Sequence, residues 1–449
     1  MANTWRNAPS IGSMRSLSFL LPSDKPHGRS ELLLLLLAAL FVFSNALALG
    51  LARDGRIDGS TLWGPLCWLA AQATAVWLLR QYAPTHDPFL LPLISLLTGW
   101  GIVLQDRLAP NFLVRQVAWV VLGTAVLVGI TLLPRNLRWL RRYRYTLLLL
   151  GILLLVATLL FGINPTGVSI ARYWLRLPIP FLNPVYFQPS ELLKLLLVIF
   201  LASYFDEREA VGALVGNGRL QRISYLAPLL LMWGFCMVLL MWQRDLGAAT
   251  LFFIVFLSLV YLATGDWRVV AGGVGLLLLA GIFAYFAFSL VTLRIDAWWN
   301  PWPDADDRAF QIVQSLYALA AGGIWGQGIG QGFPQYIPVV HSDFAFAAIA
   351  EEWGLIGSLG VVGCFALLAH RGMRLALLAE RPFRRYLAAG ITILLSAQAF
   401  LIMAGVTKLL PLTGVTLPFV SYGGSSMLIS HVMAGLLLYL STKTRQIHL

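Results

Sequence analysis

The sequence predicts an all-α membrane protein that crosses the bilayer about twelve times. Two features of its composition support this fold class. Of the 449 residues, 59% are hydrophobic and only 12% are charged, whereas a soluble domain carries about 25% charged residues. The hydrophobic residues also occur in blocks, such as 32–52, that match the roughly 20-residue helix needed to cross a bilayer. Helices are expected because backbone polar groups in lipid must pair within their own segment.

The hydrophobic blocks divide the chain into a terminal tail and a membrane-spanning part. Residues 1–30 contain little hydrophobic sequence, and we expect a flexible tail there rather than a cleaved signal peptide. Two N-terminal helices are expected within 31–87, and ten further helices within 88–445. The twelve expected spans are 31–52, 61–80, 88–106, 113–133, 144–161, 189–206, 223–241, 247–265, 269–292, 345–370, 385–408 and 425–442.

Positively charged loops set the expected orientation. The net charge is +12, and the arginines cluster in short loops, so membrane topology explains the charge better than nucleic-acid binding does. Arginine-rich loops follow the fourth and tenth spans, at 134–144 and 371–385, and such loops stay in the cytoplasm. Both chain ends, including the tail 1–30, are therefore expected in the cytoplasm. The three cysteines lie inside hydrophobic blocks, where neither a disulfide framework nor a metal site is expected.

With this orientation, three polar stretches lie on the outer side of the membrane: 162–188, 293–344 and 409–424. The longest, 293–344, is a large extracytoplasmic loop between the ninth and tenth spans. A loop of this length is usually functional or disordered, and its tryptophans make disorder a poor explanation. We therefore expect this loop to fold back onto the outer membrane face.

Charged residues lie near the expected spans at two places. Arg172 and Arg176 occupy an outer loop, where arginine can bind phosphate through its planar fork or anchor the chain at headgroup depth. Glu191 and Lys194 are three residues apart at the start of the sixth span, so they can pair along one helix face. Lys194 points towards membrane depth, and ionisable groups there usually face a cavity or a partner.

The longest outer loop ends in a glycine-rich run that leads to His341 and Asp343. Its glycines, spaced G-x-G-x-G without a preceding strand, do not match a dinucleotide-binding motif. They favour a sharply turning loop whose backbone approaches a ligand. Asp343 stands before the tenth span, where it could cap the helix, take part in chemistry, or bind a metal together with His341. The sequence shows no further ligands for such a metal.

A second irregular segment, 411–426, contains two prolines, three glycines and several hydroxyl side chains. Irregular backbone at membrane depth survives only where protein or a water-filled cavity surrounds it. The segment therefore predicts a cavity on the outer side of the membrane.

Three of these motifs resemble the SEDS family of RodA, FtsW and SpoVE. The resemblance covers roughly residues 88–445, so it implies a ten-helix SEDS glycosyltransferase core preceded by two additional helices. The matching stretches are Gln188–Glu191 with Lys194, Gly322–Gly354 with the sequence His341-Ser342-Asp343-Phe344, and Leu417–Ser426.

The resemblance implies a peptidoglycan glycosyltransferase that polymerises lipid II at the outer face of the bacterial cytoplasmic membrane. Its expected partners are lipid II, the membrane lipids and a class B penicillin-binding protein. Asp343 matches the family's essential aspartate and is the expected general base. Arg172, Arg176 and Lys194 are expected to contact phosphate, and a divalent cation such as Mg²⁺ or Mn²⁺ could share that task. The expected substrate-binding residues are Arg172, Arg176, Glu191, Lys194, Gln311, His341, Ser421 and Ser425.

Two other functions fit the same pattern. A lipid II flippase would share the helices, the buried Lys194 and the cavity, but it would not need a carboxylate on the outer face. A non-catalytic scaffold of the cell-wall synthase complex would not depend on Asp343 either. The turn at Arg244 and Asp245, where many family members have Pro-Asp, gives no local reason to expect catalysis. Such departures leave open whether the protein serves elongation or division.

Overall fold

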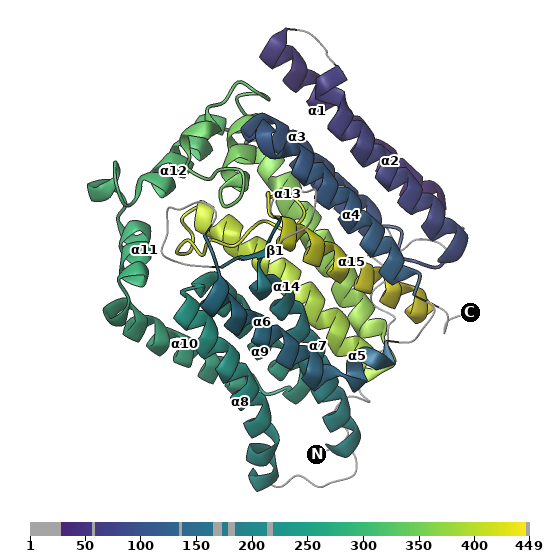
Figure 1. Ribbon diagram of the computed structural model, residues 1–449, viewed down its shortest axis with the longest axis vertical. Coiled ribbons are helices and arrows are strands. Elements are labelled where there is room, and N and C mark those ends of the chain that lie inside the picture. The colour runs from purple at the N-terminus through teal and green to yellow at the C-terminus, as the bar shows by residue number, and fades with distance from the viewer. Residues whose placement is uncertain are drawn as a thin grey trace, which may run out of the picture.

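The computed structural model describes residues 28–55, 59–133, 137–164, 173–177, 185–212 and 219–445, so most of the expected tail 1–30 lies outside it. The described chain is almost entirely helical, with one short antiparallel hairpin (Figure 1). Its elements are α1 Gly28–Asp54, α2 Gly59–Tyr82, α3 Leu90–Leu108, η3 Pro110–Phe112, α4 Leu113–Thr131, α5 Arg138–Arg142, α6 Arg144–Phe161, β1 Leu175–Leu177, β2 Val185–Phe187, α7 Pro189–Gly212, α8 Arg219–Gln243, α9 Leu246–Thr264, α10 Trp267–Ala287, α11 Ser289–Trp299, η4 Trp302–Asp304, α12 Phe310–Gly322, η5 Pro334–Tyr336, α13 Ala345–Leu378, α14 Pro382–Val406 and α15 Gly424–Arg445.

The helices confirm the polytopic all-α fold class. Within the described ranges, nine helices are long and apolar enough to cross a membrane: α1, α2, α4, α6, α9, α10, α13, α14 and α15. The helices α3, α7 and α8 coincide with the three remaining expected spans. One boundary was wrong: the span expected at 269–292 ends at Ala287, because the extended Phe288 separates α10 from α11.

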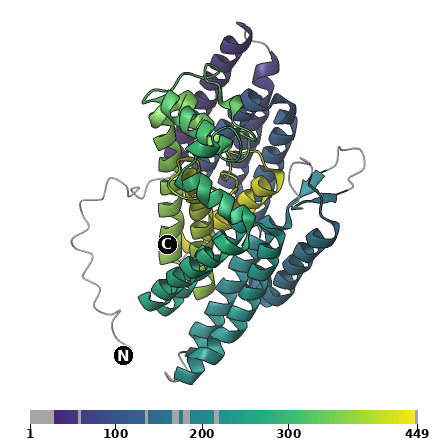
Figure 2. The same cartoon turned by 90° about the vertical axis from the view of Figure 1, so that its left-hand side faces the viewer.

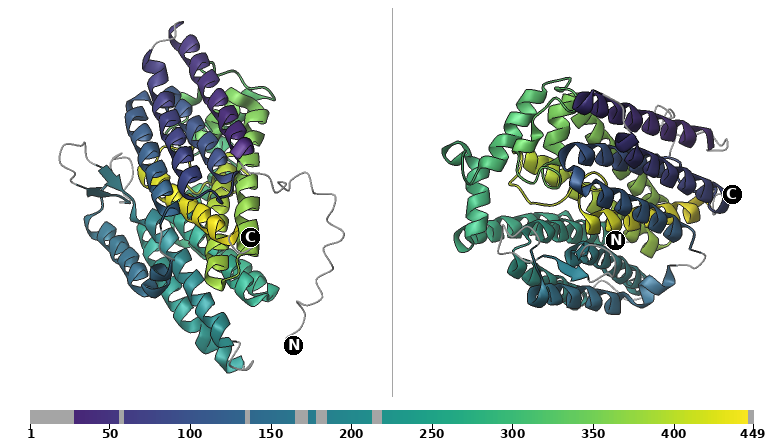
Figure 3. Two further views of the ribbon diagram at one scale, coloured as in Figure 1. Left: turned by 90° about the vertical axis from the view of Figure 1, so that its right-hand side faces the viewer. Right: turned by 45° about the horizontal axis from the view of Figure 1, so that its top comes forward.

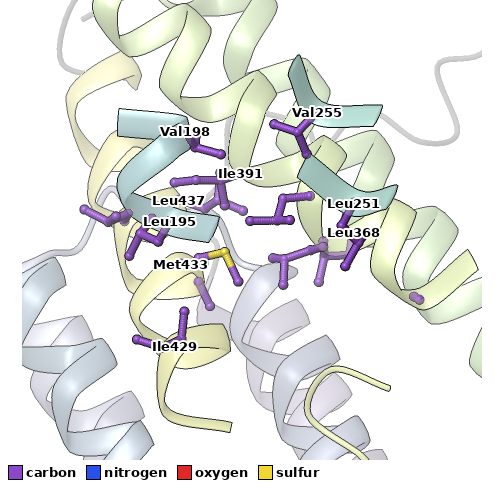
Figure 4. Close-up of a cluster of buried hydrophobic side chains, with 14 of the residues drawn as sticks. Leu195, Val198, Leu251, Val255, Leu368, Ile391, Ile429, Met433 and Leu437 are labelled. Carbon is purple, nitrogen blue, oxygen red and sulfur yellow. The ribbon is translucent and has the colours of Figure 1, made fainter. Parts of the chain in front are cut away.

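A hydrophobic core holds the centre of the bundle together. In Figure 4, Ile391 of α14 lies among side chains of α7, α9, α13 and α15, including Val198 and Leu437. Because lipid tails are as apolar as leucine, such helices associate through close packing rather than through burial from water. Gly390 permits this packing, since a Cβ there would lie 2.6 Å from Val198 Cγ1.

The helices α1 and α2 lie side by side at one edge of the bundle, against α3 and α4 (Figures 1 and 3). Polar contacts join α1 to the rest of the chain. Trp353 Nε1 donates to Asn45 Oδ1 at 2.8 Å, and Arg53 Nη1 lies 3.8 Å from Asp106 Oδ1. The two helices are thus packed into the bundle.

One end of the bundle, which we call the arginine face, carries the loops at 137–144 and 379–385. Both ends of the described chain lie there as well. Near the start of α1, Glu31 contacts the His86 ring at 2.7 Å. Near the end of α15, Ser441 Oγ accepts from Asp87 N at 2.9 Å, and Arg371 of α13 forms an ion pair with Asp87. The geometry therefore groups these regions on one side, as their charge pattern predicts.

The opposite end, which we call the Asp343 face, carries α11, α12 and the segment 411–423 (Figures 1 and 2). As expected, the long loop folds back onto the bundle. Trp298 Nε1 donates to Lys408 O at 3.1 Å, and Ser315 Oγ donates to Val406 O at 3.1 Å. These contacts fasten α11 and α12 to the end of α14.

Candidate active site

Asp343 lies immediately before α13 on the face that bears its name. It does not cap the helix, because the N-cap position belongs to Phe344 and carries no side-chain hydrogen bond. The Asp343 carboxylate instead accepts from Ser342 Oγ at 2.8 Å. The residue is half-buried, and burial raises the pKa of its carboxyl to about 6 although Ser342 and Arg294 act in the opposite direction. At neutral pH the carboxylate is therefore mostly ionised and basic enough to accept a proton.

Arg294 of α11 faces the same carboxylate across Gly414. A Cβ at Gly414 would lie 3.5 Å from Arg294 Nη2 and 3.9 Å from Asp343 Oδ2. Gly414 has φ +71°, a conformation that glycine adopts without steric cost. Arg294 Nη1 donates to Thr413 O at 3.3 Å, which holds the guanidinium in place. Among the described residues, Arg294 and Asp343 form no ion pair within 4.0 Å, so both charges remain available to a ligand.

The irregular segment 411–423 is joined directly to the residues around Asp343. Ser421 Oγ donates to Ser342 O at 2.6 Å, and Tyr422 N donates to His341 O at 2.9 Å. Ser421 Oγ also accepts from Leu417 N at 3.0 Å, which closes a turn within the segment. Ser421 thus shapes the backbone beside Asp343, and its own side chain is buried.

His341 belongs to an aromatic group beside the carboxylate. Its ring centroid lies 5.5 Å from that of Phe112 and 5.8 Å from that of Tyr422. Burial lowers the pKa of His341, so its imidazole is neutral at pH 7. Burial raises the pKa of the Tyr422 hydroxyl, and the nearby guanidinium of Arg115 in α4 acts in the opposite direction.

A buried polar chain runs from α7 to the irregular segment. Lys194 Nζ donates to Glu191 Oε1 at 2.8 Å, as the spacing of these residues predicts, and to Gln398 Oε1 at 2.9 Å. Gln398 Nε2 in turn donates to Thr416 O at 2.9 Å, and Thr416 Oγ1 donates to Ser426 Oγ at 2.7 Å. Lys194 is therefore surrounded by protein groups, and it connects α7 through α14 to residues 416–426.

A second polar group lies at the start of α7. Asp245 caps α9 by accepting from Ala248 N at 3.0 Å, and it also accepts from Ser190 Oγ at 3.2 Å. Burial raises the pKa of Asp245, partly offset by the hydrogen bond from Ala248 and by Lys194. Ser425 Oγ accepts from Gln188 N at 2.9 Å and so joins the start of α15 to this turn.

The β1–β2 hairpin approaches the site through Tyr173. The Tyr173 hydroxyl donates to Arg244 O at 3.1 Å. Burial raises the pKa of Tyr173 to about 12, and the charges of Asp245 and Arg294 also act on it. Tyr173, just before β1, therefore lies within electrostatic range of Asp245 and Arg294.

The glycine-rich loop packs against protein rather than around an open site. A Cβ at Gly322 would lie 1.9 Å from Ala350 O, and one at Gly354 would lie 2.3 Å from Gly326 N. Arg107 of α3 holds the loop through Glu352 Oε1, at 2.9 Å, and through Gly332 O, at 2.8 Å. Close approach to α13 therefore accounts for Gly322 and Gly326, and the expectation that glycines of this loop bring backbone near a ligand stays a prediction.

Two expected residues, Arg176 and Gln311, are not joined to Asp343, and a third cannot be placed. Arg176 is exposed on β1, and Gln311 of α12 is half-buried without a side-chain hydrogen bond to the described residues. Arg172 lies outside the described residues. In the part of the chain that the structure describes, no group of three or more His, Cys, Asp or Glu side chains could hold a metal ion, and His341 is instead packed against two rings.

A family model described as a cell cycle protein family, FtsW/RodA/SpoVE, matches residues 89–446. The chain belongs to the SEDS family. The RodA peptidoglycan glycosyltransferase of Mycobacterium tuberculosis strain H37Rv is 34% identical, over 93% of this chain and 91% of that protein. A probable FtsW peptidoglycan glycosyltransferase of Geobacter sp. strain M18 is 35% identical, over 80% of this chain and 98% of that protein.

The SEDS architecture also matches a solved structure. A peptidoglycan synthase complex that coordinates polymerization and crosslinking contains a chain with 28% identity and a TM-score of 0.65, covering 80% of this chain and 99% of that one. The alignment with the mycobacterial RodA covers 93% of this chain. The unaligned residues are fewer than those of α1 and α2 together, so the alignment includes part of these two helices.

Sequence reasoning missed Arg294, Arg115 and Asp245 as residues of the candidate site. Arg294 lies in a loop that contains several acids and tryptophans, and nothing local indicates that it faces Asp343. Its partner Thr413 is 119 positions away along the chain. The turn at Asp245 gave no local reason to expect a role in the site. The hydrogen bond that joins Asp245 to Ser190 connects residues 55 positions apart. Only the folded arrangement of α4, α9 and α11 brings these groups together.

Proposed function

We propose that this SEDS protein is a peptidoglycan glycosyltransferase that polymerises lipid II into glycan strands at the outer face of the bacterial cytoplasmic membrane. The observation that carries the proposal is the Asp343 carboxylate. It is half-buried, free of any helix-capping role, and basic enough to accept a proton, with a pKa of about 6. A flippase or a scaffold would have no use for a carboxylate tuned in this way.

The reaction requires one base and a means of holding pyrophosphate. The acceptor sugar hydroxyl attacks the anomeric carbon of the donor, and a new carbon–oxygen bond forms as the bond to the pyrophosphate oxygen breaks. The hydroxyl proton passes to Asp343, and the electron pair leaves with the polyprenyl pyrophosphate. One carboxylate suffices, because pyrophosphate is a good leaving group and needs no proton donor. Glycosidases use two carboxylates because their leaving group must be protonated.

Arg294 is the cation best placed to hold the departing pyrophosphate. Its guanidinium lies across Gly414 from Asp343 and forms no ion pair with the described residues. Positioned cations stabilise charge that develops in the transition state, and a guanidinium matches the geometry of phosphate oxygens. Arg172 and Arg176 remain proposed phosphate contacts from the hairpin side, since the adjacent Tyr173 lies within range of the Arg294 charge.

Glu191, Lys194, Ser421 and Ser425 act on the substrate through the backbone that they position. Lys194 is bound by Glu191 and Gln398, so its charge is matched by protein groups. Ser421 and Ser425 use their hydroxyls to fix the backbone of Ser342 and Gln188, respectively. We propose that these residues keep the site in shape, while His341 and Gln311 contact the sugars directly. Among the expected site residues, Asp343 is the carboxylate that lies beside Arg294. A divalent cation bound at Asp343 would therefore need further ligands from the substrate.

The orientation follows from the arginine face, because arginine-rich loops remain in the cytoplasm. The chain ends then lie in the cytoplasm, and the Asp343 face lies outside. Lipid II could keep its tail in the outer leaflet while its head reaches Asp343. A class B penicillin-binding protein is the proposed partner that cross-links the product, and the likeness to a chain from a synthase complex supports it.

A lipid II polymerisation assay on the full-length purified protein tests the function. Wild type and Asp343→Asn should be compared with and without a co-expressed class B penicillin-binding protein. Glycan ladders from wild type and none from the variant would support a polymerase that depends on Asp343. Translocation of fluorescent lipid II across vesicles without any ladder would instead favour a flippase. Equal growth support by wild type and the variant would favour a scaffold.

A further inference from the structure

A cavity of about 760 Å³ opens on the arginine face, far from Asp343. Its walls are α5, the start of α6, the end of α7 and the start of α14, which lie together in Figure 1. A volume of this size matches the pockets that hold small organic ligands. Six arginines line it: Arg138, Arg141, Arg142, Arg144, Arg381 and Arg384.

The cavity has more positive charge than its own acids can balance. Arg141 Nε lies 2.9 Å from Asp206 Oδ2, and Arg144 forms an ion pair with Glu207. Asp206 is further occupied by the backbone, since Phe383 N donates to its Oδ1 at 3.2 Å. The other four arginines form no ion pair with the described residues: Arg138, Arg142, Arg381 and Arg384.

These four guanidinium groups come from two walls that are far apart in sequence. Like charges around one cavity repel one another, so the protein keeps them together at an energetic cost. A phosphate group offers acceptor oxygens to several guanidinium forks at once. An anion in the cavity would therefore relieve the repulsion and join α5 to α14.

The aromatic side chains beside the cavity indicate where it lies relative to the bilayer. In and beside α5, Leu137 and Leu140 are buried, whereas Trp139, Tyr143 and Tyr145 are exposed. Trp and Tyr collect at the depth of lipid headgroups because one part of the ring system is apolar and another polar. The cavity therefore lies at the level where the phosphates of the surrounding leaflet are found.

We propose that this cavity binds the phosphodiester headgroup of an anionic phospholipid from the leaflet on the arginine face. The arginines hold the phosphate, and the exposed aromatic side chains contact the glycerol and acyl region of the same lipid. Basic pockets between membrane helices are suited to such headgroups. The site is separate from the Asp343 chemistry, so its test does not depend on the proposed function.

Native mass spectrometry of the full-length protein, exchanged into mixed phosphatidylglycerol and phosphatidylcholine, tests the proposal. Wild type should retain phosphatidylglycerol in preference to phosphatidylcholine. The double variant Arg142→Gln with Arg381→Gln removes one exposed, unpaired arginine from each wall. Each arginine near a membrane surface contributes roughly fivefold to the affinity for an anionic lipid. The affinity of the double variant for phosphatidylglycerol should therefore fall about 30-fold.

The matched control is Arg29→Gln with Arg374→Gln, which removes the same charge from the arginine face but outside the cavity lining. The control should bind phosphatidylglycerol as wild type does, and an equal loss in both variants would overturn the proposal by showing a general charge effect. Excess inorganic phosphate should not displace the lipid; full displacement would assign the cavity to a free anion. Binding of an acidic peptide through the same arginines, without any lipid preference, would also overturn it.

Discussion

The Arg294 guanidinium and the Asp343 carboxylate face each other across Gly414, without forming an ion pair. A Cβ on this glycine would be 3.5 Å from Arg294 Nη2 and 3.9 Å from Asp343 Oδ2. A neutralised pair would leave neither charge for a substrate. The separation leaves a base and a cation side by side, which is the combination that glycosyl transfer from a pyrophosphate requires.

Replacing Asp343 with Asn should abolish most of the polymerisation activity. General base catalysis contributes about 10²–10⁴-fold, so the rate should fall by at least about 10². The rate of glycan strand formation from lipid II measures this effect. Thermal unfolding in detergent should show no loss of stability at neutral pH, because burial makes the ionised carboxylate unfavourable in the folded state.

Asp306→Asn is the matched control for this change, since Asp306 is an exposed acid in the same loop. It should polymerise lipid II at the wild-type rate. Wild-type activity in Asp343→Asn, or an equal loss in both variants, would remove Asp343 from the mechanism.

The pH profile of polymerisation should follow the ionisation of Asp343. The pKa of about 6 means that the rate should rise as pH increases through about 6, because the base must be deprotonated. Arg294 lowers this pKa, so Arg294→Gln should move the midpoint to higher pH as well as reduce the maximal rate. The exposed Arg308→Gln serves as the control and should leave the profile unchanged. If the pH midpoint of Arg294→Gln equals that of wild type, this result would contradict the proposed proximity of Arg294 to Asp343.

Gly414→Ala should impair both activity and stability. At φ +71° a side chain costs roughly 1–2 kcal/mol, and the methyl group would occupy the space between Arg294 and Asp343. We expect roughly a tenfold lower polymerisation rate, since small misplacements of reacting groups are costly. Gly363→Ala in α13 is the control, because a Cβ there meets nothing within 4 Å. If Gly414→Ala retains full activity, the gap between the two charges has no role.

Lys194→Met should destabilise the whole protein. It would leave Glu191 buried without its cation, and breaking a buried ion pair costs about 3–5 kcal/mol. The melting temperature in detergent measures the loss. The double variant Lys194→Met with Glu191→Leu removes both charges and should recover much of it, since an apolar pair of similar volume is often nearly neutral. A double variant no more stable than the single one would show that the ion pair is not the cause.

The sequence was sufficient for most of the fold because hydrophobic block length directly reports a membrane span. It failed at the end of α10, where Leu290 and Val291 continue the hydrophobic pattern although the helix has already broken at Phe288. A backbone change at one residue leaves no trace in hydropathy. The grouping of the arginine loops was accessible because charge distribution and topology are physically linked.

The candidate site was only partly predictable. Asp343 could be selected because three motifs resembled one family, and the pairing of Glu191 with Lys194 follows from helix periodicity. The roles of Arg294 and Asp245 depend on contacts between distant segments, which local patterns do not encode. The close approach of Gly322 and Gly326 to the backbone of α13 was not predicted, because it too depends on contacts between separate segments.

The hydrogen bond from Tyr422 N to His341 O connects two segments about 80 positions apart, and it lies two residues from Asp343. Together with the hydrogen bond from Ser421 to Ser342, it joins the two backbone segments firmly to each other. The connection between α14 and α15 is mostly buried or half-buried, and its exposed residues are Thr407, Leu409 and Gly414. Because the two hydrogen bonds join this connection to residues 341 and 342, any displacement of it would also shift the backbone beside Asp343.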